Sequence, residues 1–403
     1  MLNTPFAPWP SFTQEEADAV SAVILSNRVN YWTGEQCRAF EQAFADWTGS
    51  AHAIALANGT VALDLALHGL GIGAVNGGAV SDEVIVTPRT FIASASCVAN
   101  AGAVPVFADV DLESGNLSAE TIAAVLTPRT KAVIIVHLAG WPADMDPIMA
   151  LARAHGVKVI EDCAQAHGGR YKGRSVGTIG DVGAWSFCQD KIMTTGGEGG
   201  MVTCNDRDLW SRMWSFKDHG KSWEAVYQRD HPPGFRWLHE SIGTNWRMLE
   251  MQAAIGLVQL GRMADWTAAR TRNAAVLYDI LAPFSGPDGC LRVPRLNSAE
   301  GSVHAEYKFY AYVRPDRLAD GWDRDRIIAE INARGVPCFQ GSCSEVYLEK
   351  AFDGTGARPA QRMPAARQLG DTSLMWLVHP TLTDEQMQVA AKETYAVMAA
   401  ASA

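Results

Sequence analysis

Residues 185–200 read Trp-Ser-Phe-Cys-Gln-Asp-Lys-Ile-Met-Thr-Thr-Gly-Gly-Glu-Gly-Gly. Lys191 lies near the middle of this stretch, five residues after Ser186 and shortly before the glycines. A lysine taken alone is by default a solvated surface residue. Glycine-rich surroundings at the end of an apolar strand suit a side chain that points into a cleft instead. We therefore interpret Lys191 as a functional residue.

Two motifs upstream extend this interpretation. Val159-Ile-Glu-Asp-Cys-Ala-Gln-Ala-His-Gly places Asp162 at the exit of an apolar strand, and Asn58-Gly-Thr-Val-Ala-Leu places Gly59 and Thr60 at the start of a helix. Pyridoxal phosphate requires a lysine for its Schiff base, a carboxylate for its pyridinium nitrogen and a helix start for its phosphate. The three features together predict this cofactor. Taken singly, the aspartate or the threonine could be an ordinary helix cap.

Three further residues are candidates for the same site. Ser186 could add a hydroxyl to the phosphate site, and Gln165 could reach the phenolic oxygen of the cofactor. Phe91 follows an apolar strand and could stack on the pyridine ring. A core phenylalanine and a plain helical glutamine are the alternatives. Lys191, once released as a neutral amine, could serve as general base and acid.

Apolar segments alternate with helical segments over the first 205 residues. This pattern is typical of a mostly parallel sheet covered by helices on both faces, which binds ligands beyond the carboxyl ends of its strands. We expect helices at 60–70, 92–101, 147–155 and 206–216, and strands at 52–57, 83–88, 104–109, 132–137, 158–162, 182–187 and 200–204.

The remaining segments suggest two domains. Thr13-Gln-Glu-Glu is a capping box that opens a helix, and a second helix follows at 35–47. Residues 217–246 are irregular and aromatic, as in a functional or flexible loop. Residues 249–281 predict one long or slightly broken helix. We place a large domain at 1–265 and a smaller C-terminal α/β domain at 266–403.

Composition narrows the function. The chain has 403 residues, 48% apolar and 19% charged, and a net charge of −10, which argues against nucleic-acid binding. No C-x-x-C pair occurs among the eight cysteines, so we expect reduced thiols in a cytoplasmic protein and no metal site. No secretory signal or membrane span is apparent, and no membrane partner is expected.

The chain resembles the DegT/DnrJ/StrS family of pyridoxal-phosphate-dependent nucleotide-sugar aminotransferases. Six ordered motifs carry the resemblance, and together they are far more specific than any one of them. They are Asn58-Gly-Thr-Val-Ala-Leu63, Asp82-Glu-Val-Ile-Val-Thr-Pro-Arg-Thr-Phe91, Val106-Phe-Ala-Asp-Val-Asp111, Glu161-Asp-Cys-Ala-Gln-Ala-His-Gly168, Ser186-Phe187 and Gly243-Thr-Asn-Trp-Arg-Met248.

This resemblance implies a type I aminotransferase fold and a homodimer with active sites shared at the interface. It implies that Lys191 is the Schiff-base lysine, Asp162 the pyridine partner and Gln165 the contact to the phenolic oxygen. By the same resemblance Phe91 stacks on the ring and Gly59, Thr60 and Ser186 hold the phosphate. Asn245, with Arg247 beside it, would come from the neighbouring subunit to reach the phosphate or the substrate.

Three departures from the family pattern bear on the substrate more than on the cofactor. Gly196-Gly197 adds a residue to the loop after the lysine, Ile192 replaces a common asparagine, and the 217–246 segment is long and aromatic. Arg247, Thr195 and Tyr310 are candidate substrate contacts, with His304 and Tyr307 near the last of them.

We therefore expect a transaminase that moves an amino group from glutamate to the ketone of a nucleotide-linked keto-sugar, in amino-sugar biosynthesis for a surface polysaccharide or natural product. The alternatives are a free keto-sugar, a keto-cyclitol or a sugar keto acid as acceptor. The intact lysine and aspartate, Lys191 and Asp162, argue against a regulator that binds the cofactor without catalysis. An α/β protein with no cofactor would require the ordered motifs to be coincidence. The sequence leaves open the aminated carbon, the nucleotide and the pathway.

Overall fold

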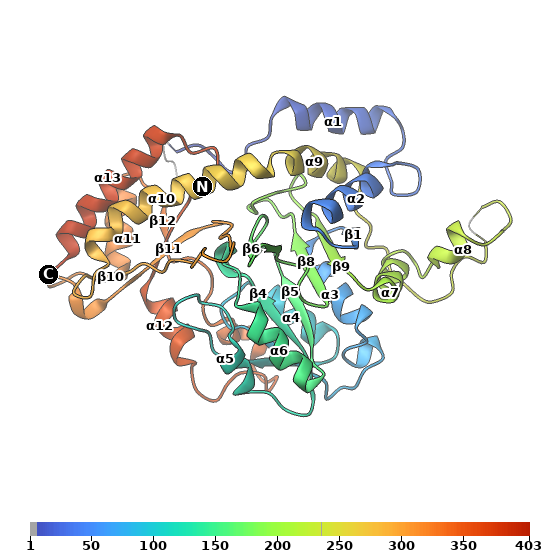
Figure 1. Ribbon diagram of the computed structural model, residues 1–403, viewed down its shortest axis with the longest axis horizontal. Coiled ribbons are helices and arrows are strands. Elements are labelled where there is room, and N and C mark those ends of the chain that lie inside the picture. The colour runs from blue at the N-terminus through green and yellow to red at the C-terminus, as the bar shows by residue number, and fades with distance from the viewer. Residues whose placement is uncertain (1–5, 235) are drawn as a thin grey trace.

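The computed structural model describes residues 6–234 and 236–403. Its centre is a seven-stranded sheet in the order β1-β9-β8-β5-β4-β2-β3 (Figure 1). The strands are β1 His52–Leu56, β2 Glu83–Val86, β3 Val104–Phe107, β4 Thr130–Val136, β5 Lys158–Asp162, β8 Val182–Ser186 and β9 Gly200–Cys204.

Five neighbouring strands of this sheet, β8-β5-β4-β2-β3, run parallel, and β9 pairs antiparallel with both β8 and β1. The register pairs Val136 with Asp162, and Asp162 with Ala184. The carboxyl ends of β4, β5 and β8 therefore meet at one edge of the sheet. The mostly parallel α/β sheet predicted from the alternating segments is confirmed.

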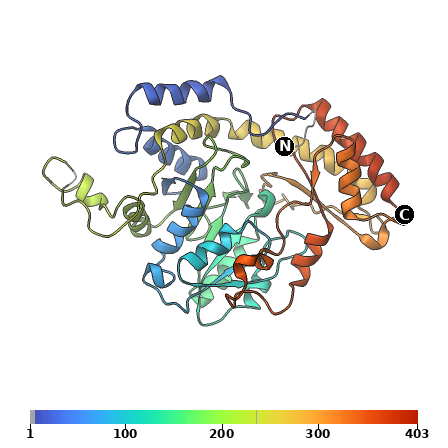
Figure 2. The same ribbon diagram turned by 180° about the vertical axis from the view of Figure 1, so that it is seen from behind.

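Helices cover both faces of the sheet, and the strand residues alternate between them. In β4, Ala132 and Ile134 belong to the hydrophobic cluster on one face, whereas Val133 and Ile135 belong to the cluster on the other. The opposite views in Figures 1 and 2 show which helices lie on each face. They are α3 Gly59–Gly69 and α4 Ala93–Asn100 on the first face, and α5 Ala119–Ala123 and α6 Met145–His155 on the second.

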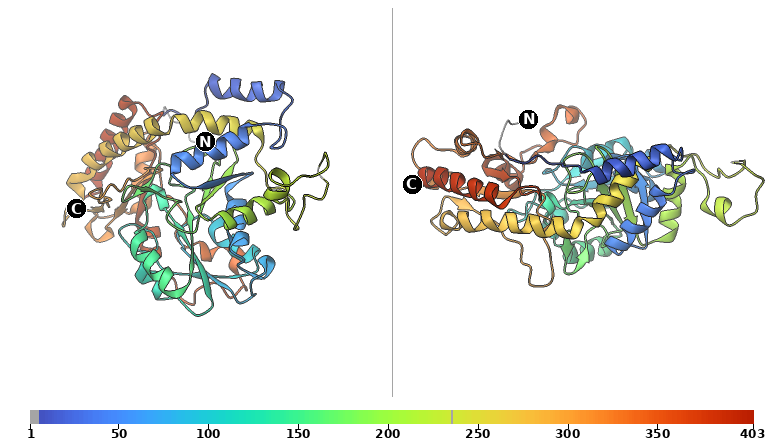
Figure 3. Two further views of the ribbon diagram at one scale, coloured as in Figure 1. Left: turned by 45° about the vertical axis from the view of Figure 1, so that its right-hand side comes forward. Right: turned by 90° about the horizontal axis from the view of Figure 1, so that it is seen from above.

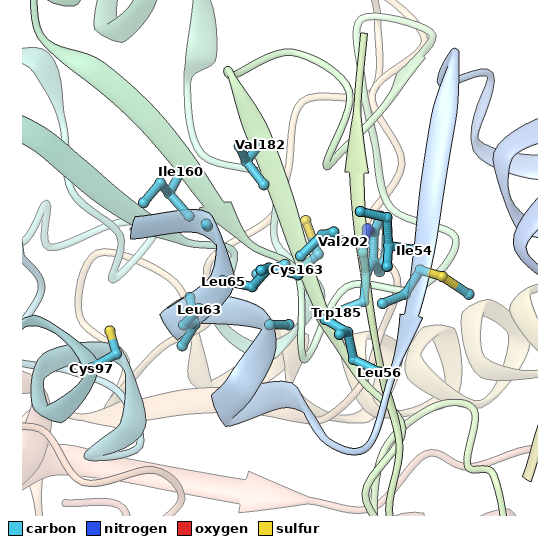
Figure 4. Close-up of a cluster of buried hydrophobic side chains, with 14 of the residues drawn as sticks. Ile54, Leu56, Leu63, Leu65, Cys97, Ile160, Cys163, Val182, Trp185 and Val202 are labelled. Atoms are coloured by element: carbon cyan, nitrogen blue, oxygen red, sulfur yellow. The ribbon is translucent and has the colours of Figure 1, made fainter. Parts of the chain in front are cut away.

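Helix α3 packs against β8 and β9. Its residues Leu63 and Leu65 lie in one buried cluster with Trp185 and Val202 (Figure 4). This packing holds the start of α3 at the edge where the parallel strands end, and so it positions the residues described below.

The two N-terminal helices lie along the helical segment predicted at residues 249–281. α1 (Gln14–Leu25) begins with the expected capping box, in which the Thr13 N–H donates to Glu16 Oε2 at 2.9 Å. α1 and α2 (Gln36–Thr48) both pack on α9 (Glu250–Gly261). α10 (Met263–Leu281) follows after a break at Arg262, so the predicted helix is confirmed in its broken form.

A second sheet of four antiparallel strands lies beyond α10, in the order β10-β11-β13-β12. Its hydrophobic cluster is separate and includes Ala274 and Leu277 of α10. The elements are β10 Leu291–Arg292, β11 Phe309–Val313, α11 Arg324–Ala333, β12 Cys338–Phe339, α12 Pro364–Thr372, β13 Ser373–Trp376 and α13 Asp384–Ala401.

Between α7 (Arg207–Lys217) and α9 the chain leaves the body of the molecule. This arm, residues 222–234 and 236–243, contains the short helix α8 (Trp223–Tyr227) and projects outward in every view (Figures 1 and 3). Its Trp237 is 78% exposed and its Ile242 92% exposed. The expected irregular segment is thus an outward loop with apolar side chains in solvent.

The shorter elements connect these parts. A small hairpin, β6-β7, was not expected from the sequence. Across the described residues, no helix combines the length and apolarity needed to cross a membrane. The remaining bounds are β6 Arg170–Tyr171, β7 Arg174–Ser175, and the 3-10 helices η1 Ala74–Asn76, η2 Leu138–Gly140, η3 Ala282–Phe284, η4 Pro315–Arg317, η5 Val346–Leu348 and η6 Lys350–Phe352.

Candidate active site

Two adjoining cavities meet at Lys191. The first, here the strand-end cavity, has a volume of about 610 Å³ and lies at the carboxyl ends of β5 and β8. The second, here the inter-sheet cavity, has a volume of about 600 Å³ and is lined by residues of the large domain and of β11, β12 and β13. Both cavities are lined by Thr90, Phe91, Gln165, Asp190 and Lys191.

The start of α3 forms one wall of the strand-end cavity. Asn58 caps the helix by accepting the Val61 N–H at 3.0 Å, which leaves the first N–H groups of the helix without helical partners. A Cβ on Gly59 would lie 2.5 Å from the Ser186 Cβ, so only glycine lets the end of β8 approach this helix start. Thr60 and Ser186 line the cavity beside it. N–H groups and hydroxyls at a helix start suit an anion such as phosphate.

Asp162 lies at the end of β5, buried in the same cavity. Its carboxylate accepts from the Ser94 hydroxyl at 2.8 Å and from the Ala164 N–H at 3.1 Å. Burial raises the pKa of Asp162, and these hydrogen bonds and the positive charge of Lys191 only partly offset it. The carboxylate thus lacks a close cationic partner, and a cation in the cavity would supply one.

Glu161, the preceding residue, points to the other face of the sheet. It accepts N–H groups from Gly177, Ile179 and Gly180 at 2.7 to 2.9 Å and pairs with His137 at 3.0 Å. Burial would raise the pKa of Glu161, but these bonds hold it below its ordinary value. Every oxygen of this carboxylate is therefore engaged within the protein.

The hydrogen bonds of Glu161 also bear on the role of the residues around it. His137, Glu161 and Cys163 lie close enough together to hold a metal ion. His137 Nδ1, however, accepts the Ala143 N–H at 3.0 Å, so Nε2 carries the proton that is donated to Glu161. A histidine with both nitrogens engaged by the protein is a structural residue and not a metal ligand.

Gln165 and Phe91 line both cavities. The Gln165 side-chain oxygen accepts the Ala139 N–H at 2.8 Å, which leaves its NH2 group, a pure donor, for a ligand in the cavities that it lines. Phe91 is 70% exposed although it lines both cavities. An exposed aromatic face beside a cavity is available to stack on a planar ligand.

Lys191 stands at the junction with one carboxylate next to it. Its Nζ lies 3.3 Å from Asp190 Oδ1, and the Tyr307 hydroxyl donates to Asp190 Oδ2 at 2.6 Å. Burial would raise the pKa of Asp190, but the charge of Lys191 and the bond from Tyr307 keep it below its ordinary value. Asp190 therefore stays ionised and holds the lysine amine at the boundary between the cavities.

The structure does not bring every predicted residue to these cavities. Thr195 is buried and donates its hydroxyl to the Glu198 carbonyl at 2.6 Å. Asn245 is exposed, and Arg247 pairs with Asp218 at 2.6 Å. In the part of the chain that the structure describes, none of these three lines either cavity. Tyr310 does line the inter-sheet cavity, where its hydroxyl accepts the Ser342 N–H at 2.8 Å.

The additional glycine after Lys191 has a local explanation. Gly196 and Gly197 have φ values of 88° and 125°, both in the region that favours glycine. The loop therefore accommodates its extra residue with two consecutive glycines that have positive φ.

Several residues that line the cavities were not predicted from the sequence. Asp190 adjoins the key lysine but belongs to none of the recognised motifs. Lys308, Phe339 and Met375 lie in or next to β11, β12 and β13, more than a hundred residues after Lys191. In this region the sequence pointed only to Tyr310, with His304 and Tyr307 near it.

The chain is similar to several known proteins. The GDP-perosamine synthase of Caulobacter vibrioides is 41% identical over 74% of this chain and 73% of its own length. An L-glutamine:2-deoxy-scyllo-inosose aminotransferase of Streptomyces kanamyceticus is 36% identical over 83% of this chain and 76% of its own. The crystal structure of an aminotransferase from Psychrobacter cryohalolentis is 64% identical with a TM-score of 0.95, and covers 98% of this chain and 99% of its own. A sequence model of the DegT/DnrJ/EryC1/StrS aminotransferase family matches residues 10–393, and the chain belongs to this family of transaminases.

Proposed function

We propose that this transaminase uses pyridoxal phosphate to carry an amino group from glutamate to the ketone of a nucleotide-linked keto-sugar, as a step in amino-sugar biosynthesis. The observation that carries the proposal is the position of Lys191, whose amine stands between a cavity suited to the cofactor and a second cavity of similar volume for the substrate. The resemblance to a synthase whose name includes a GDP-linked sugar supports the choice of acceptor.

The strand-end cavity fits pyridoxal phosphate residue by residue. The start of α3, with Gly59, Thr60 and Ser186, would hold the phosphate. Asp162, whose buried carboxylate lacks a cation, would pair with the pyridine nitrogen. Gln165 would donate to the phenolic oxygen, Phe91 would cover the ring, and Lys191 would make the covalent link. When bound, the cofactor supplies an electron sink for the carbon that exchanges its amino group.

The chain's own residues have distinct tasks in this reaction. Lys191 Nζ takes the proton from the donor carbon that bears the amino group, and later returns a proton to the acceptor carbon. Asp190, held by the Tyr307 hydroxyl, keeps that amine at the junction between the cavities. The walls of β11, β12 and β13 orient the substrate beside it.

A keto-cyclitol is the second candidate acceptor, because the Streptomyces kanamyceticus relative is named for 2-deoxy-scyllo-inosose. The test is a product assay. The holoenzyme is supplied with glutamate and then with keto-sugars linked to GDP, UDP or dTDP and with free keto-cyclitols, and amine products are identified by mass spectrometry. Amination of a nucleotide-linked sugar is expected. Amination of free ketones alone would move the function to the second candidate.

We further propose a homodimer with shared active sites. The exposed apolar residues of the arm and the location of Asn245 and Arg247 outside their own cavities support this. Mixing Lys191→Ala with Asn245→Ala subunits tests it. Shared sites predict that the mixture regains up to about a quarter of wild-type activity, because some dimers then carry one intact site. Two inactive variants that never complement each other would count against the proposal.

We also keep the proposed boundary near residue 265, which is supported by separate hydrophobic clusters around the two sheets. All eight cysteines are free thiols, which supports a location in the reducing cytoplasm.

A further inference from the structure

The inter-sheet cavity contains a lysine that no motif predicted. Lys308 directly precedes β11 and lines this cavity together with Lys191. Its Nζ lies 4.7 Å from the centroid of the Tyr307 ring, and Lys191 Nζ lies 5.6 Å from the same centroid. The two amines are therefore separated by no more than the sum of these distances. Both lysines line the same cavity, so a ligand held in it beside Lys191 is accessible to Lys308.

Lys308 has no close ionic partner. No residue that the structure describes forms an ion pair or hydrogen bond with its amine. The charge of Asp190 acts on Lys308 from a distance, but this carboxylate is already engaged by Lys191 and by the Tyr307 hydroxyl. Glu349, which also lines the cavity, is exposed and unpaired with Lys308. Burial raises the pKa of Glu306 to about 8, so that carboxyl is mostly neutral at pH 7. The cavity thus presents two lysines, Lys191 and Lys308, that share the charge of one carboxylate, Asp190.

The amino donor brings the matching anion. An amino acid carries its α-carboxylate on the same carbon that exchanges the amino group, and this anion must enter the cavity with it. Among the described residues that line the cavity, Lys191 and Lys308 are the cationic side chains, and no arginine is present. Lys191 is committed to the reaction. A buried carboxylate without a cationic partner would be strongly unfavourable.

We propose that Lys308 binds the α-carboxylate of the amino donor in the inter-sheet cavity. This inference rests on the proposed transaminase function and adds a donor-binding residue to it. Burial lowers the pKa of Lys308 to about 8, so the amine is still mainly protonated at pH 7 and can bind an anion. A phosphate of the nucleotide-linked acceptor is the other anion that could reach the cavity.

Chemical labelling of the holoenzyme tests the binding without turnover. Glutarate and GDP serve as unreactive probes for a carboxylate and a phosphate, and acetylation of each lysine by acetic anhydride is followed by mass spectrometry. Glutarate at ten times its dissociation constant should slow the labelling of Lys308 about tenfold. It should leave the exposed Lys392 unchanged, and GDP should have no effect. Protection by GDP and not by glutarate would overturn the proposal.

Half-reaction kinetics with glutamate alone provide the second test. Lys308→Met should raise the glutamate concentration at half-maximal rate by about 10- to 100-fold, the usual loss for a charged hydrogen bond. Lys308→Arg should recover most of the affinity, and Lys392→Met is the matched control. Cofactor binding, measured by titration, should be unchanged in all three variants.

The outcomes separate this inference from the proposed function. A wild-type holoenzyme that does not react with glutamate would refute the transaminase itself. An active wild type with unchanged glutamate affinity in Lys308→Met would refute only the role of Lys308. If Asp190→Asn combined with Lys308→Met restored the wild-type affinity, Lys308 would merely balance Asp190, and the proposal would also be wrong.

Discussion

The two cavities that meet at Lys191 differ in which parts of the chain supply their lining residues. The strand-end cavity takes its residues from consecutive strand ends of one parallel sheet, whereas the inter-sheet cavity joins that sheet to three strands from the C-terminal part. The first holds groups suited to a fixed cofactor, and the second holds an unpaired lysine and aromatic walls. The contrast predicts that changes confined to one cavity leave the function proposed for the other cavity largely intact.

The most severe test of this contrast removes Lys191, one of five residues that line both cavities. Lys191→Ala should lower turnover by at least about 10³-fold, because the general base and the covalent attachment are lost together. Steady-state assays with glutamate measure the effect, and Lys392→Ala is a matched exposed control. Activity within tenfold of wild type would show that the reaction does not pass through this lysine.

A second change addresses the strand-end cavity alone. Asp162→Asn should lower turnover roughly 10²-fold, since a neutral amide cannot stabilise a protonated ring nitrogen as an anion does. The circular dichroism spectrum should remain that of the wild type, and the affinity for glutamate should change little. A variant with full turnover would remove Asp162 from the site.

Glu161, the carboxylate next to Asp162, provides a comparison in which stability is expected to change and turnover is not. Glu161→Gln should reduce the free energy of unfolding by about 2–4 kcal/mol, because its NH2 group would face either the Ile179 and Gly180 N–H donors or the Gly177 N–H and the His137 ring N–H. Turnover of the folded fraction should be nearly unchanged. Denaturant titration measures the difference, and equal stability would show that this network contributes nothing.

The same pair of proteins gives a pH test. The folded pKa of Glu161 lies below its ordinary value, so its contribution to stability is present above that ordinary value and is lost as the pH falls through the folded pKa. The stability gap between wild type and Glu161→Gln should therefore narrow in acid. A constant gap from pH 7 to pH 3 would contradict this linkage.

The smallest effect is expected in the inter-sheet cavity. Tyr307→Phe removes the hydroxyl that orients Asp190, and turnover should fall by about fivefold, the equivalent of one hydrogen bond. Cofactor affinity should stay the same. A large loss of bound cofactor would show that the two cavities are not separable.

The sequence predicted most of the first cavity and little of the second, for a physical reason. Gly59, Asp162, Ser186 and Lys191 follow elements whose order determines where they meet, because parallel strands bring their carboxyl ends to one edge. Phe339 and Met375 reach Lys191 only through the packing of a second sheet, which no local pattern encodes. Asp190 was overlooked because its partner, Tyr307, lies more than a hundred residues away.

The arm shows a similar limit. The irregular composition of residues 217–246 predicted a loop, and the structure shows an outward arm with one short helix. Asn245 lines neither cavity of its own chain, and the contact with a second subunit that we propose for it would leave no periodic signal within one chain.

The most direct measurement of the central claim is the visible absorbance of the purified protein loaded with pyridoxal phosphate. The account predicts a yellow band that depends on Lys191, disappears when glutamate is added and returns with a nucleotide-linked keto-sugar. No band, or a band that glutamate does not change, would contradict the account.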